Sequence, residues 1–122
     1  MLCILLNIVP MNDNFIAKWE SQVKKGVLEF IILIVLSRKE LYGYELITEL
    51  KSRTDYNVAE GTIYPILNRL KAEKLIQSHW QEMESGVPRK YYKITKEGTK
   101  LLQLMITSWD ALATSIQRLK TK

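Results

Sequence analysis

Residues 60–70 of this chain read EGTIYPILNRL, and residues 86–92 read GVPRKYY. Apolar residues recur every three or four positions in the first segment, which predicts a short amphipathic helix. The second segment joins turn residues to basic and β-forming residues, which predicts a hairpin. A helix that fits the DNA major groove, followed by a basic hairpin that reaches the phosphates, forms a winged helix-turn-helix. The predicted fold is therefore mainly α with a small two-stranded β wing.

The helix expected at about residues 60–74 has two chemically different faces. Ile63, Leu67 and Leu70 share one face and are expected to bury the helix. The other face offers hydroxyl, amide and guanidinium groups that can contact phosphates, adenine and guanine, although an ordinary solvated face is the alternative. Pro65 is expected in the first turn, where a missing N–H leaves no helical bond unmade. The residues predicted to contact DNA from this helix are Thr62, Tyr64, Pro65, Asn68 and Arg69.

The hairpin is expected to have strands at residues 75–83 and 89–94. Its second strand carries three cations that are predicted to neutralise DNA phosphates: Arg89, Lys90 and Lys93. The alternative is a hairpin whose basic residues only protect an exposed sheet edge. Thr95 follows as the expected N-cap of the last helix, because its hydroxyl can accept a hydrogen bond from an orphaned backbone N–H.

A long N-terminal helix is expected from residue 15 to about residue 36. Its apolar residues, beginning with Ile16 and Trp19, recur at three- and four-residue steps and predict one buried face. The apolar run 27–36 would also suit a buried strand, but no turn signal precedes it. Pro10 is expected to break the apolar segment before this helix. Three segments are predicted. Residues 1–13 form an extension that is either disordered or upstream of a true start at Met11. Residues 14–95 form a winged helix-turn-helix, which includes a shorter helix that opens near Tyr42, and residues 96–122 form a dimerisation helix.

The last helix carries apolar residues separated by steps of 3, 4, 3, 4 and 3. This spacing is a narrow seam of the kind that packs against a partner helix. A winged helix of this size does not need such a helix to complete its own core. A homodimer packed through the first and last helices is therefore predicted. The residues predicted at its interface are Phe30, Leu102, Met105, Trp109, Leu112, Ile116 and Leu119.

Composition narrows the classes of protein that fit. Eighteen Lys and Arg against thirteen Asp and Glu give a net charge of +5, which favours a polyanionic partner. A single cysteine, Cys3, and a single histidine, His79, allow no internal disulfide and no two-imidazole metal site. The sequence contains no catalytic constellation and no phosphate-binding glycine loop, so no enzyme activity, cofactor or metal is expected. The N-terminal apolar run is too short to span a bilayer, and a cytoplasmic protein without membrane contact is expected.

Three blocks of the chain resemble the signature of the phenolic acid decarboxylase regulator (PadR) family. They are LYGYEL at 41–46, GTIYPILNRL at 61–70 and PRKYYKIT at 88–95, and the resemblance covers residues 25–120. It implies a winged helix-turn-helix homodimer of the short subgroup, which represses genes until a small molecule releases it. Tyr42, in the first block, joins the residues predicted to contact DNA.

Two residues depart from the family pattern. Lys74 stands where the family often has glycine, so the helix is expected to end without a left-handed cap. Val87 stands where a basic residue is common, which weakens one expected phosphate contact. The DNA partner is expected to be double-stranded and to carry an inverted repeat whose half-sites lie about 34 Å apart.

Trp109 resembles the tryptophan with which a multidrug-binding branch of the family stacks flat drugs at the dimer centre. With Trp19 and Met105, it is predicted to bind a small hydrophobic or planar aromatic effector. Simple packing in the seam is the alternative for both tryptophans. Two other functions fit the same sequence: a winged-helix module that binds another protein, and a protein that sequesters small molecules without specific DNA binding.

Overall fold

The computed structural model describes residues 2–55 and 57–121, with side chains from residue 13 onward. The described chain forms four helices and three strands in the order α1–β1–α2–α3–β2–β3–α4. This is the predicted winged helix with long terminal helices. The helices are α1 (Leu2–Arg38), α2 (Gly43–Arg53), α3 (Glu60–Ala72) and α4 (Lys96–Lys120), and the strands are β1 (Leu41–Tyr42), β2 (Ile76–Gln81) and β3 (Arg89–Ile94).

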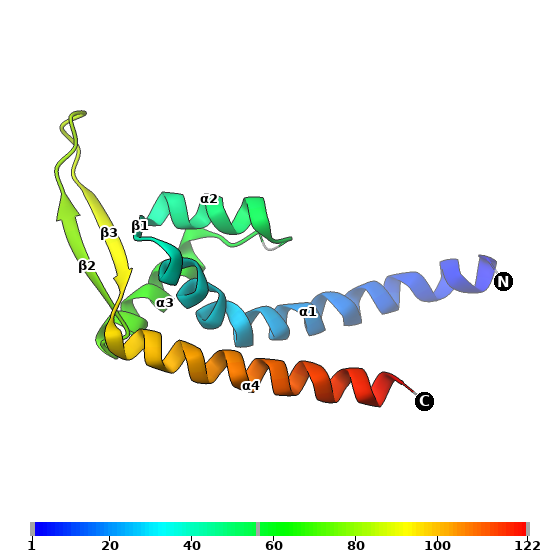
Figure 1. Ribbon diagram of the computed structural model, residues 1–122. Coiled ribbons are helices and arrows are strands. Elements are labelled where there is room, and N and C mark those ends of the chain that lie inside the picture. The colour runs from blue at the N-terminus through cyan, green and yellow to red at the C-terminus, as the bar shows by residue number, and fades with distance from the viewer. Residues whose placement is uncertain (1, 56, 122) are drawn as a thin grey trace.

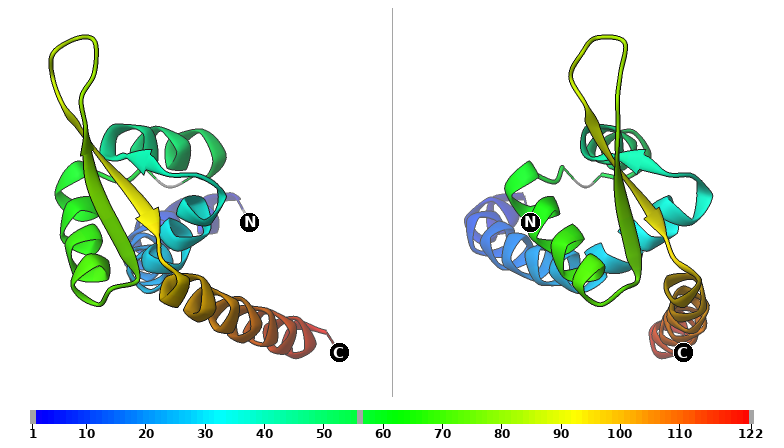
Figure 2. Two further views of the ribbon diagram at one scale, coloured as in Figure 1. Left: turned by 60° about the vertical axis from the view of Figure 1, so that its left-hand side comes forward. Right: turned by 90° about the vertical axis from the view of Figure 1, so that its left-hand side faces the viewer.

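The two long helices run side by side in opposite directions. Figure 1 shows α1 and α4 extending away from the region where α2, α3 and the sheet gather. Figure 2 shows α3 beside the base of the β2–β3 hairpin, while the tip of the hairpin projects beyond the helices. The hairpin and α3 therefore share one end of the molecule.

The core lies where α1, α2, α3 and the sheet meet. The prediction for α3 is confirmed, because Ile63, Leu67 and Leu70 are each 0% exposed. Burying a leucine or isoleucine side chain contributes about 1.5–3 kcal/mol, so this face anchors the helix firmly. The buried apolar set is Leu28, Ile32, Leu33, Leu36, Leu41, Leu46, Leu50, Ile63, Leu67, Leu70, Ile76, Tyr92 and Leu102.

Helix α1 differs from its prediction in length and in its buried face. It begins at Leu2 and continues through Pro10, because a proline removes one helical hydrogen bond without having to end the helix. Its second half is helical and partly buried, as predicted, but Ile16 and Trp19 are exposed. Both belong to the N-terminal half of α1, and Figure 1 shows this half extending past α2, α3 and the sheet. The translation start at Met11 stays a prediction.

The sheet is three-stranded, in the order β1–β3–β2, with both pairs antiparallel. The hairpin is confirmed, with Gln81 opposite Arg89 and Ile76 opposite Ile94. Strand β1 was not predicted, because a two-residue strand is too short to show any periodicity in the sequence. It pairs with the middle of β3 and so ties the start of α2 to the wing.

Helix α3 ends in a left-handed cap, which corrects the prediction made for Lys74. This residue has φ = 64°. Its N–H donates to the carbonyl of Lys71 at 3.0 Å, and the Leu75 N–H donates to the carbonyl of Leu70 at 3.0 Å. These two bonds are those of a Schellman motif, in which a lysine occupies the position that glycine favours.

Lys74→Gly is expected to raise the free energy of unfolding by about 1 kcal/mol, because an L-residue in this conformation is strained by about 1–2 kcal/mol. Chemical denaturation measures the change. Lys71→Gly is the matched control, since it removes the same charge within α3 and is expected to destabilise by about 1 kcal/mol. Equal destabilisation by both variants would contradict the expected strain at Lys74.

The start of α4 is held by Thr95, as predicted. Its Oγ1 accepts a hydrogen bond from the Gly98 N–H at 3.0 Å and donates to the Lys74 carbonyl at 2.7 Å. Gly98 is buried, and a Cβ atom there would overlap the Leu75 carbonyl oxygen and lie 2.8 Å from Cγ1 of Ile94. The first turn of α4 is thus packed directly on the loop after α3. In the part of the chain that the structure describes, no helix is both long and apolar enough to cross a membrane.

Candidate nucleic-acid interface

The outward face of α3 is exposed along its length. The predicted residues Thr62, Pro65, Asn68 and Arg69 are all exposed, and Tyr64 is partly covered on one flank. Thr62, Pro65 and Arg69 line a groove between α3 and α1. Asn68 lies on neither flank and points outward from the middle of the face, given the helical spacing.

Pro65 occupies a later position than predicted. Because α3 begins at Glu60, Pro65 is past the first turn and cannot donate the helical hydrogen bond to the carbonyl of Gly61. The prediction of a first-turn position was wrong although the helix start was predicted at about residue 60, because the fifth residue after Glu60 already lies in the second turn. The exposed proline therefore removes one helical bond on the outward face.

Arg69 forms an ion pair with α1. Its Nη2 lies 2.6 Å from Oε1 of Glu29, and the arginine side chain is 51% exposed. An exposed pair of this kind contributes about 0–1 kcal/mol, so Arg69 can exchange Glu29 for another anion at little cost. Until another anion replaces it, the Glu29 carboxylate holds the Arg69 guanidinium at the edge of α3.

Tyr64 closes the other flank of α3 by packing on the start of α2. A Cβ atom at Gly43 would overlap the Tyr64 hydroxyl and lie 2.8 Å from its Cζ. Gly43 therefore permits a close approach between the two helices of the helix-turn-helix. Any larger residue at position 43 would push Tyr64 outward.

The structure gathers several predicted residues around a second hollow of about 300 Å³ between α2, α3 and the wing. The Arg89 guanidinium lies 4.5 Å from the ring centroid of Tyr42, and Lys90 Nζ lies 5.8 Å from that of Trp80. Such cation–aromatic contacts hold the side chains in place while the cations stay accessible to an anion. The hollow is lined by Tyr42, Gly43, Tyr64, Trp80, Pro88, Arg89, Lys90 and Tyr92.

Tyr92 forms the buried floor of this hollow. Burial, and then the electrostatic effect of Tyr64, raise the pKa of Tyr92 above its ordinary value. The Tyr92 phenol therefore stays neutral at physiological pH, and the charge of the hollow comes from Arg89 and Lys90.

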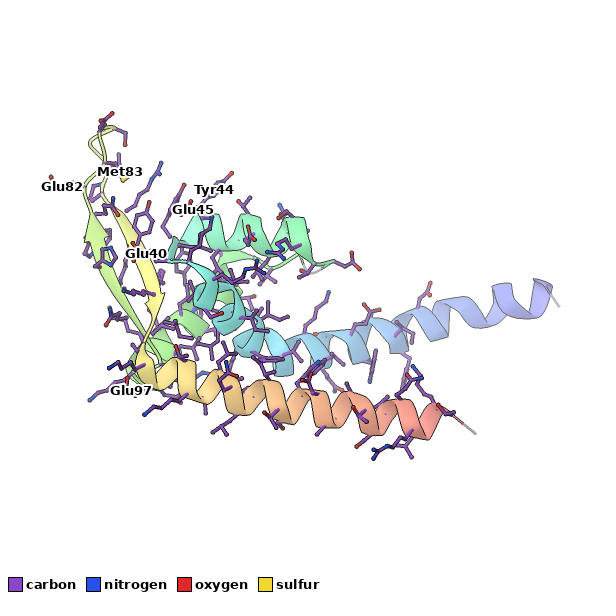
Figure 3. The ribbon with its side chains drawn as sticks, in the orientation of Figure 1. Glu40, Tyr44, Glu45, Glu82, Met83 and Glu97 are labelled. Atoms are coloured by element: carbon purple, nitrogen blue, oxygen red, sulfur yellow. The ribbon has the colours of Figure 1, made fainter. Side chains whose placement is uncertain are left out.

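Arg89 and Lys90 lie at the end of β3 nearest the hairpin loop, whereas the loop itself is acidic. Figure 3 shows Glu82 and Met83 where β2 passes into the loop, and Glu84 follows them in the sequence. Lys93 is exposed but lies outside the hollow, opposite Gln77 near the other end of β3. A phosphate backbone would therefore meet Arg89 and Lys90 near α3 rather than the tip of the wing.

Trp80 is a candidate contact that sequence reasoning missed. It is 66% exposed on β2, directly opposite Lys90, and it lines the hollow. A large exposed aromatic residue beside a cation is typical of binding surfaces. Its pairing with Lys90 could have been found from the hairpin register, since both residues lie in the predicted strands.

His79 is exposed on β2. Its Nε2 lies 3.7 Å from Oε1 of Glu40, and its ring stacks on Tyr91. Among the side chains that the structure describes, no cluster of three His, Cys, Asp or Glu residues could hold a metal ion. Cys3 lies outside those side chains.

The residues predicted for dimerisation and ligand binding fall into two groups. Leu102 is only 3% exposed and belongs to the core of this chain, which corrects its prediction as an interface residue. Gly98 and Leu102 are the inner face of the first turns of α4, and this face packs on the core of the same chain. Further along, Trp109 is 43% exposed and its ring lies 5.8 Å from that of Phe30. Met105 is partly buried against the core, whereas Trp19, Leu112, Ile116 and Leu119 are exposed.

The predicted ligand residues are not all neighbours within one chain. Trp109 contacts Phe30, but Trp19 lies eleven residues before Phe30 on α1, a distance of about 16 Å along a helix. Trp19 and Trp109 of the same chain therefore do not form one site around Phe30.

Residues 32–104 match the family model described as transcriptional regulator PadR-like family. The chain is similar to transcriptional regulator Rv3488 of Mycobacterium tuberculosis, with 35% identity over 66% of this chain and 74% of that protein. It is also similar to transcriptional regulator YqjI of Escherichia coli, with 36% identity over 64% of this chain but only 37% of that protein.

Solved structures show the same fold. A PadR-like transcriptional regulator from Bacillus cereus is 42% identical, with a TM-score of 0.76 over 83% of this chain and 98% of the other. A PadR family regulator from Eggerthella lenta is 28% identical, with a TM-score of 0.82 over 92% of this chain and 97% of the other. The family match spans the end of α1, the helix-turn-helix, the wing and the start of α4. The chain therefore belongs to the PadR-like family and is a winged-helix, DNA-binding transcriptional regulator rather than an enzyme.

Proposed function

We propose that the protein is a homodimeric, sequence-specific repressor that binds an inverted-repeat operator in the cytoplasm and is released by a small hydrophobic or planar aromatic ligand. The observation that carries the DNA contacts is the exposed face of α3, with Arg69 on one flank and the Arg89–Lys90 pair on the other. Helix α3 would read the major groove while Arg89 and Lys90 of the wing bind phosphates.

The apolar surface of the two long helices supports the dimer. Phe15 and Trp19 of α1 and Leu112, Ile116 and Leu119 of α4 are exposed in the single chain. Clustered exposed apolar residues of this size usually mark a protein interface. A two-fold axis through this surface would present two copies of α3 to successive major grooves, about 34 Å apart.

The contact between Trp109 and Phe30 supports the ligand. Both rings are partly exposed, so a flat aromatic molecule could stack on them in a dimer seam. Quenching of Trp109 fluorescence by planar aromatic compounds is the expected result, with Trp19→Phe and Trp80→Phe substitutions used to isolate the signal. A broad panel that leaves Trp109 fluorescence unchanged would count against ligand release at this position.

Fluorescence anisotropy tests the DNA function. The protein is titrated with its own upstream DNA and with a scrambled sequence of the same length, across a salt series. Binding that keeps its preference for the upstream DNA as salt rises supports a sequence-specific regulator. Equal and weak binding to both, lost with salt, would favour the rival function, a winged-helix module that binds another protein.

A charged pair in the seam of α4 is expected to break the dimer. Leu112→Glu with Ile116→Glu places two carboxylates on the exposed apolar face, where dimerisation would bury them unpaired. Sedimentation is expected to show monomers, and operator affinity is expected to fall because one half-site remains. Leu104→Glu is the control, since Leu104 is exposed but lies outside the seam spacing. A double variant that stays dimeric would place the interface elsewhere.

A further inference from the structure

A groove separates the middle of α1 from the first half of α3. Its volume is about 560 Å³, which lies in the range of roughly 300–1,000 Å³ typical of small-molecule sites. It belongs to a single chain, since α1 and α3 form both walls. It is also distinct from the Trp109 seam, because Glu29 lines the groove while the next residue, Phe30, contacts Trp109.

The lining of this groove combines an apolar floor with excess positive charge. Leu28 is buried, and Val58 and Ile66 are partly buried against the core. Three cations, Lys24, Lys25 and Arg69, line the same groove with one carboxylate, that of Glu29. Because the cations outnumber the carboxylate, the lining carries a net positive charge near an apolar surface. The Glu29 carboxylate is paired with Arg69.

We propose that this groove binds a small organic anion, in which a compact apolar body rests on Leu28 and Ile66 while a carboxylate, sulfonate or phosphate faces Lys24, Lys25 and Arg69. An anion is favoured over a cation by the sign of the lining, and an organic anion over an inorganic ion by the apolar floor. Several cations around one acidic group also stabilise it better than a single surface pair.

The groove shares residues with the outward face of α3. Thr62, Pro65 and Arg69 line the groove and are also predicted to contact DNA. A bound anion would compete with DNA phosphates for Arg69, so it would lower operator affinity. This effect on DNA rests on the proposed function, whereas binding of the anion itself does not.

A matched pair of fluorescent probes tests the site directly. Anilinonaphthalene sulfonate carries an anionic group on a compact aromatic body, and phenylnaphthylamine is its neutral counterpart. The sulfonate is expected to bind the wild-type protein more tightly than the neutral probe. Equal affinity for the two probes, or no binding of the sulfonate, would overturn the proposal.

Three variants locate the bound probe. Lys24→Glu with Lys25→Glu is expected to weaken sulfonate binding by about tenfold, a change of about 1.4 kcal/mol. Ser21→Trp, at the exposed rim, is expected to obstruct the groove without changing its charge. Trp109→Ala is expected to leave binding in the groove intact. Circular dichroism checks that each variant folds.

A control variant with the same change in net charge shows whether sulfonate binding depends on the groove or only on the overall charge of the protein. Lys96→Glu with Lys100→Glu alters exposed lysines on α4, outside the groove, and is expected to preserve sulfonate binding. Loss of binding in Trp109→Ala alone would move the site to the seam and overturn the proposal. Sulfonate binding that responds to the groove variants supports the site even if the wild-type protein shows no operator preference. Failure of the DNA function and failure of the site are therefore distinguishable.

Discussion

Replacing Arg89 and Lys90 together with alanine is expected to weaken operator binding by about a hundredfold or more. The two cations of the wing line the hollow that Tyr64 of α3 also lines, and the proposed dimer would present four of them. Each lost phosphate contact lowers the slope of log affinity against log salt by about 0.9, so the slope should fall by roughly three to four units. Fluorescence anisotropy across a salt series measures both quantities.

Lys96→Ala with Lys100→Ala is the control for the wing variant. It removes the same number of charges from exposed positions on α4, outside the hollow that contains Arg89 and Lys90. A similar loss of affinity in both variants would mean that only the overall charge matters. The loss of the Arg89 contact with Tyr42 is expected to leave the fold intact, since the cation–aromatic contact is at the surface.

Gly98→Ala is expected to lower the free energy of unfolding by about 2 kcal/mol, because forcing an extra carbon into a packed site costs about 1–3 kcal/mol. The added Cβ would overlap the Leu75 carbonyl oxygen, which belongs to the backbone and cannot rotate away. This carbonyl also accepts a hydrogen bond from the Thr95 N–H at 3.0 Å, so moving it would disturb the start of α4. Urea denaturation measures the difference.

Gly26→Ala is the matched control for this substitution. A Cβ atom at Gly26, within α1, would have no neighbour within 4 Å. Alanine is favoured over glycine inside a helix by about 1 kcal/mol, so this variant is expected to gain stability. The two identical substitutions should therefore change stability in opposite directions. A Gly98→Ala protein as stable as the wild type would show that α4 can shift away from Leu75.

The parts of the fold that follow local rules could be predicted from the sequence. Ile63, Leu67 and Leu70 revealed the buried face of α3 because helical spacing alone puts them together. The turn residues before Arg89 predicted the hairpin, and the Thr95 hydroxyl predicted the start of α4. Each of these signals acts over a few residues.

The parts that depend on distant residues could not be predicted. The pairing of Arg69 with Glu29 requires α1 and α3 to meet, and no pattern within either helix reveals it. Leu102 has the spacing of the exposed seam but is buried by the core. Lys74 adopts a conformation that favours glycine, because the bonds of Lys71 and Leu70 to the following loop outweigh the local preference.

Two consecutive residues of α1 contact the surfaces proposed to bind DNA and ligand. Glu29 holds Arg69 on the recognition helix, and Phe30 contacts Trp109 on α4. Glu29 and Phe30 are adjacent in the same helix. A ligand that shifted the backbone at Phe30 would therefore also shift Glu29. Thermodynamic linkage then works in both directions: DNA that engages Arg69 would change the affinity for a ligand at Trp109 by the same factor that the ligand changes the affinity for DNA. Titrating ligand into the free protein and into the operator complex would yield that factor once, and titrating DNA into the free and the ligand-bound protein would yield it again, independently.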